Sequence, residues 1–118
     1  MANTYGLTRR LISAVNRLYN CHIVLNISSF FNNREGPNNQ VNMYVLKEEY
    51  HFPDGERVNR ELFRSASSVY TCLYMRDLLY VLQDKEIPDD NNEGWENMKI
   101  KRNVAESIAY IKEKYGKL

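Results

Sequence analysis

The 118-residue sequence has few of the residues on which catalysis and metal binding depend: two cysteines, two histidines and five scattered glycines. A nucleophilic enzyme needs an activated Ser or Cys beside a histidine that a third group orients, and only His22 and His51 can serve. A tetrahedral metal site needs more ligands than the adjacent Cys21 and His22 supply. No cluster of glycines forms a phosphate-binding loop. We therefore expect a protein that is not an enzyme and that uses no cofactor or metal.

The sequence also lacks an apolar run long enough to cross a membrane. The longest candidate, residues 69–82, contains Arg76 and Asp77, and a membrane helix needs about 20 residues with few or no charges. The first residues have neither the basic start nor the apolar stretch of a secretory signal. We expect a cytoplasmic protein with no membrane contact, in which Cys21 and Cys72 are reduced and packed.

Charge is nearly balanced over the whole chain but uneven along it. The net charge is +1, yet residues 1–20 hold three arginines and no acid, residues 61–95 are acidic, and residues 96–118 are basic again. Frequent tyrosine and paired asparagines are typical of AT-rich genomes, including those of low-GC bacteria and their phages. The composition therefore suggests a small phage or mobile-element protein, without any motif that identifies one.

Hydrophobic periodicity predicts a helix followed by a hairpin in the first half of the chain. Residues 4–19 repeat apolar side chains at helical spacing, whereas residues 21–31 and 40–52 alternate as half-buried strands do. The segment between these strands carries Gly36-Pro37 at its middle and predicts a loop.

Two further helices are predicted in the second half. Pro53-Asp54-Gly55 indicates a turn, and Asn59 suits the N-cap of a long helix that ends near Asp84. From Val69 onward this helix is apolar nearly all round, which is typical of a central core element. A last helix is predicted from Trp95 to Tyr115.

The predicted fold class is therefore α+β, a small single domain over residues 1–118 with the order α-β-β-α-α. Its antiparallel β-hairpin is expected to pack on three helices. A two-stranded hairpin is marginal in water unless helices cover it or further strands extend it. We accordingly expect a homodimer through the hairpin, or binding of the hairpin to another protein.

The leading functional hypothesis is stoichiometric protein binding, as by an inhibitor of a host or defence protein or by an adaptor. Missing catalytic residues, a hairpin that accepts more strands and an uneven charge pattern favour it. The single tryptophan is the first candidate contact, since tryptophan is enriched at interface hot spots. The hairpin supplies the others, so the predicted protein-binding residues are Trp95, Arg34, Tyr44 and Tyr50.

Binding of nucleic acid is the alternative hypothesis. If the first and last helices lie side by side, their basic residues form a patch that contacts phosphates. The residues of this patch are Arg9, Arg10, Arg17, Lys99, Lys101 and Arg102.

Binding of a nucleotide-like ligand is a third hypothesis. Arg76 lies in an apolar stretch near several tyrosines, and a guanidinium beside aromatic rings suits an anionic or aromatic ligand. The candidate ligand-binding residues are Arg76, Tyr74 and Tyr80, and a structural ion pair between Arg76 and Asp77 explains the same charges.

Overall fold

The computed structural model describes residues 4–31, 40–87 and 95–115, with only the backbone described for Phe30, residues 95–97 and Tyr115. The elements are α1 (Thr4–Tyr19), β1 (Ile23–Phe31), β2 (Gln40–His51), β3 (Arg57–Ser65), α2 (Ser68–Leu82) and α3 (Trp95–Tyr115). The α+β class is confirmed, but the order is α-β-β-β-α-α. The predicted order α-β-β-α-α was wrong by one strand, the third.

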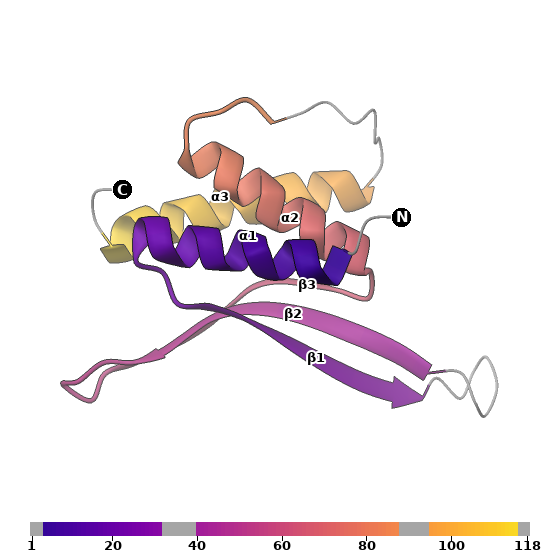
Figure 1. The fold of residues 1–118 in the computed structure, drawn as a ribbon, viewed down its shortest axis with the longest axis horizontal. Helices are drawn as coiled ribbons and strands as arrows, with labels where there is room; N and C mark the ends of the chain where they lie inside the picture. The colour runs from indigo at the N-terminus through magenta and orange to yellow at the C-terminus, as the bar shows by residue number, and fades with distance from the viewer. Residues whose placement is uncertain (1–3, 32–39, 88–94, 116–118) are drawn as a thin grey trace.

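The three strands form one antiparallel sheet in the order β1-β2-β3, so β1 and β3 are its two edges. All three helices lie on one face of this sheet, with α2 between α1 and α3 (Figure 1). The predicted central position of α2 is therefore confirmed. The other face of the sheet carries no helix within the described residues (Figure 1). One covered and one open face is common in antiparallel sheets.

The segment before α2 was predicted as helix from Asn59, and this prediction was wrong. Pro53-Asp54-Gly55 turns the chain back into β3, with Gly55 at a φ of +94°. The N-cap of α2 is Ser67, whose hydroxyl accepts a hydrogen bond from the Tyr70 N–H. A β-bulge opposite Leu46/Lys47 interrupts the pairing of β2 with β3. The bulge buries both Leu62 and Phe63, so β3 lacks the simple alternation that marks a strand.

The core lies between the sheet and the helix layer. Its members come from all six elements and include Ile12, Val15, Ile23, Leu46, Phe63, Tyr74, Met75, Leu78, Ile100, Val104 and Ile111. The Tyr74 ring stacks on the Phe63 ring with 4.8 Å between centroids, and its hydroxyl is hydrogen-bonded to Ser107 of α3. Cys21 and Cys72 are free and buried, as predicted.

The sheet is longer than the helix layer that covers it. The far end of the β1–β2 hairpin projects past the helices on one side, and the β2–β3 hairpin projects past them on the other (Figure 1). The radius of gyration is accordingly 15.4 Å, whereas a compact chain of this length gives about 13.5 Å. Within the described residues, no helix combines the length and the apolar character needed to cross a membrane.

Candidate functional site

The free edge of β1 presents unpaired backbone groups to one side of the sheet. The Glu49 N–H donates to the His22 carbonyl at 3.0 Å, so even-numbered residues along β1 direct their backbone groups toward β2. Odd-numbered residues therefore direct theirs toward the free edge. Within the described residues, no hydrogen bond is made by the outward N–H and C=O of Leu25, Ile27 and Ser29.

One side chain closes the first position of this edge. Asn16 of α1 accepts from the Ile23 N–H at 2.8 Å and donates its Nδ2 to the Ile23 carbonyl at 3.0 Å. Its amide thus makes both hydrogen bonds that a neighbouring strand makes at an antiparallel pair. The open part of the edge begins at Leu25.

The open part has none of the features by which proteins protect sheet edges. The sequence of β1, IVLNISSFF, contains no charged residue and no proline over its 9 residues. The other edge differs, because β3 carries Arg57, Arg60, Glu61 and Arg64 as well as the bulge. Lys99 of α3 also donates to the outward Arg64 carbonyl at 2.8 Å. Among the described strands, only β1 therefore has a free edge without charged residues, proline or a bulge.

A groove runs beside the start of β1, beneath α1. Its volume is about 280 Å³, and Arg9, Ile12 and Ser13 of α1 face Ile23, Val24 and Leu25 of β1 across it. Farther along the same strand, Ile27 at its middle and Phe31 at its end are 42% and 63% exposed. A groove thus lies beside the start of β1, and exposed apolar side chains lie at the middle and at the end of the same strand.

A buried carboxylate marks a second candidate site, on β2 opposite the first residue of β1. Glu48 of β2 is 0% exposed, its Oε1 accepts from the Tyr110 hydroxyl at 2.9 Å, and its Oε2 has no partner among the described residues. The Arg60 guanidinium lies 4.4 Å from the Tyr110 ring centroid. Burial and, to a smaller extent, the charge of Glu48 raise the pKa of Cys21 to about 12.

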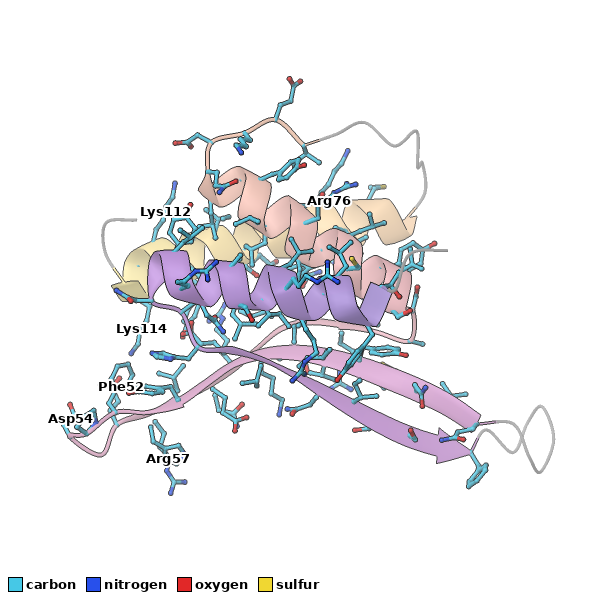
Figure 2. All side chains as sticks on the ribbon, viewed as in Figure 1. Phe52, Asp54, Arg57, Arg76, Lys112 and Lys114 are labelled. Atoms are coloured by element: carbon cyan, nitrogen blue, oxygen red, sulfur yellow. The ribbon has the colours of Figure 1, made fainter. Side chains whose placement is uncertain are left out.

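A cavity of about 340 Å³ opens beside this carboxylate, lined by Arg60, Tyr110, Glu113 and Lys114. Lys114 pairs with Glu56 at 2.8 Å and its Nζ lies 5.3 Å from the Phe52 ring centroid. Figure 2 shows Lys114 extending from the end of α3 toward Phe52. Charges of both signs line the cavity, so it shows no preference for one class of ligand. Within the described residues, no group of three or more His, Cys, Asp or Glu side chains is placed to hold a metal ion.

Of the predicted protein-binding residues, only Tyr44 and Tyr50 have side chains in the described part of the chain. Tyr44 is half-buried on β2, and the Tyr50 ring stacks on the His22 ring at 3.7 Å, near the opposite end of that strand. Trp95 begins α3, but its side chain lies outside the described part of the chain. Arg34 lies outside it entirely.

The basic residues are divided between two separated helices. Arg10 and Arg17 are exposed on α1, and Lys101 and Arg102 are exposed on α3, with α2 between the two helices (Figure 1). Arg9 lines the groove beside β1. Lys99 points to the sheet, bonded to Arg64 and 5.2 Å from the Phe63 ring centroid. The helices do not lie side by side, so these residues form no continuous patch.

The three candidate ligand-binding residues also face different surroundings. Tyr74 is 0% exposed and bonded to Ser107, whereas Arg76 and Tyr80 are partly exposed on α2. The Arg76 guanidinium pairs with the buried Asp77 at 2.8 Å, and Figure 2 shows Arg76 on the side of α2 away from the sheet. Tyr74 thus belongs to the core rather than to an open pocket.

Comparison of the chain with protein-family models, with curated proteins and with solved structures gives no match. Sequence reasoning predicted the hairpin as the contact element but named none of the edge residues Leu25, Ile27 and Ser29. The absence of charge in residues 23–31 was visible in the sequence and points to them. No sequence pattern reveals that Asn16 closes the edge, because that contact depends on how α1 packs.

Proposed function

We propose that this chain is a non-catalytic protein that acts by stoichiometric protein binding, and that a strand of the bound protein adds to the free edge of β1. The observation that carries the proposal is the uncharged edge from Leu25 onward, with its outward backbone groups unpaired. In this mode of recognition, backbone hydrogen bonds provide affinity and pockets for alternate side chains provide specificity. The groove beneath α1 is such a pocket.

The proposal covers an inhibitor or adaptor that binds a strand of a different protein, and a homodimer that binds a strand of a second copy. It places the protein in the cytoplasm, where the buried, unpaired cysteines Cys21 and Cys72 remain reduced. A phage or mobile-element origin rests on composition alone. The nucleic-acid alternative has less support, because α2 separates the two basic helices.

Site-specific photocrosslinking in the cells that make the protein tests this proposal. A photoreactive amino acid at Ile27, on the edge, is expected to give a discrete protein adduct. The same amino acid at the exposed Ala105 of α3 is the control. Adding Ser29→Pro should abolish the adduct, because proline removes an outward N–H and leaves the backbone hydrogen bonds between β1 and β2 in place. It also removes the exposed hydrogen bond that the Ser29 hydroxyl donates to Asn42 of β2, so circular dichroism is needed to establish that the variant is folded. An Ile27 adduct pattern no different from that of Ala105 would overturn the proposal.

A further inference from the structure

The uncharged edge strand is complementary to itself. A pair formed by two copies of one strand brings two equal net charges together, and β1 carries no charge that would oppose the pairing. We infer that the strand that adds to β1 is β1 of a second copy, which joins the two sheets into one sheet with three strands from each copy. This inference rests on the proposed function and names the partner of the same edge.

The hydrogen-bonding pattern fixes the register of this pair. Outward groups belong to odd-numbered residues, and those of Ile23 are already bonded to Asn16. The longest pairing that leaves Asn16 in place therefore runs from Leu25 to Phe31, with its two-fold axis at Ser28. Leu25 then faces Phe31 of the second copy, and Ile27 faces Ser29.

This register brings the exposed apolar side chains to the groove. Odd-numbered residues of β1 lie on the helix side of the sheet, where Ile23 and Leu25 line the groove beneath α1. Phe31, 63% exposed in the single chain, is placed beside Leu25 of the other copy, at the mouth of that groove. The Phe31 ring of each copy thus lies at the groove of the other copy. Such reciprocity is what a two-fold interface requires.

Charge does not oppose the pairing. Arg9 lines the groove together with residues as far along β1 as Leu25. At about 3.4 Å per residue, the three residues from Leu25 to Ser28 on each side of the axis separate the near ends of the two grooves, and with them the two Arg9 side chains, by roughly 20 Å. That distance exceeds the Debye length of about 8 Å at physiological salt, so their repulsion is screened. Arg9 is the single charged residue lining the groove, so the groove gives an acidic strand of another protein only one partner for its charges.

A cysteine at the two-fold axis tests the register. The two Ser28 residues form a pair without mutual hydrogen bonds, with Cα atoms about 4.5 Å apart, which is within the range for a disulfide. Ser28→Cys is expected to give a disulfide-linked dimer under mild oxidation. Ser29→Cys is the matched control, since its Cα atoms would be about 8 Å apart and beyond disulfide reach. The natural cysteines do not compete, because Cys21 and Cys72 are only 3% and 7% exposed.

Light scattering during size exclusion provides an independent measurement. The natural chain is expected to show twice its single-chain mass, and Ile27→Lys, which places a charge in the pair, should weaken the dimer about 10-fold or more. Circular dichroism establishes that each variant is folded. A monomeric natural chain, together with Ser28→Cys that links no faster than Ser29→Cys, would overturn the inference.

The two proposals fail in different ways. If the Ile27 crosslink contains only a different protein and Ser28→Cys stays monomeric, self-pairing is wrong while strand addition at β1 stands. If Ile27 gives no specific adduct and Ser28→Cys stays monomeric, both are wrong. An Ile27 adduct of the chain with itself, lost in Ser29→Pro, supports both.

Discussion

Removal of one hydroxyl from the Glu48–Tyr110 pair should destabilise the protein more than a typical surface change does. The Tyr110 hydroxyl is the only hydrogen-bond donor that the described structure gives to the Glu48 carboxylate, which is 0% exposed. Tyr110→Phe keeps the ring beneath Arg60 and removes only this donor. A buried charged acceptor left without a partner costs about 2–3 kcal/mol.

A double-mutant cycle separates the charge of Glu48 from the packing of the ring. In a Glu48→Gln background the acceptor is neutral, so Tyr110→Phe should cost about 1 kcal/mol there. The expected coupling between the two positions is therefore about 1–2 kcal/mol.

Urea unfolding monitored by circular dichroism provides the measurement. With a slope near 2 kcal/mol per M, the loss in the natural background lowers the urea midpoint by about 1–1.5 M. A loss below about 0.5 kcal/mol, which is typical of neutral surface changes, would refute the reasoning. Equal losses in both backgrounds would also refute it, because the charge of Glu48 would then be irrelevant.

Three further predictions concern the edge, the turn and alkaline pH. Asn16→Ala removes both hydrogen bonds to Ile23 and should lower the free energy of unfolding by about 1–2 kcal/mol in the same urea assay. Asn103→Ala is the control and should cost less, because the Asn103 amide bonds only the Lys99 carbonyl. Gly55→Ala should lower the free energy of unfolding by about 1–2 kcal/mol, because φ at this position is +94°. The cost is backbone strain alone, since nothing lies within 4 Å of an added Cβ, and a lower thermal midpoint should report it. Burial first, and then Glu48, raises the pKa of Cys21 and of Tyr110 to about 12 in the folded protein. The contribution of these two groups to the free energy of unfolding is therefore complete below about pH 9 and is lost as pH rises toward 12. Urea titrations across that range should show the decline.

The sequence predicted those elements whose hydrophobic pattern has a single period. α1 and α3 repeat at helical spacing and β1 alternates, and their predicted bounds agree with the structure to within two residues. β3 was missed because the bulge buries two consecutive side chains, Leu62 and Phe63, and so removes the alternation that marks a strand. The cap was misplaced for a related reason, since both Asn59 and Ser67 suit an N-cap and only the pairing of β3 with β2 excludes the first.

The candidate site was less predictable than the fold. The hairpin was predicted as a contact element because two strands alone are marginal. Which of its two edges is free depends on β3, which the sequence did not reveal. The burial of Glu48 was also hidden, because alternation places Glu48 and Glu49 on opposite faces without saying which face α3 covers. The Asn16 contact joins residues on two elements and has no periodicity to reveal it.

The protected edge of β3 limits how large an assembly this sheet can build. An uncharged strand of this length is otherwise a hazard, since open-ended pairing of such strands leads to fibres. Whatever strand occupies β1, the sheet still ends on its other side at β3, where Arg57, Glu61, Arg64 and the Lys99 hydrogen bond oppose another strand. In the proposed assembly, growth by edge pairing therefore stops after one addition at β1, because β3 does not accept a further strand.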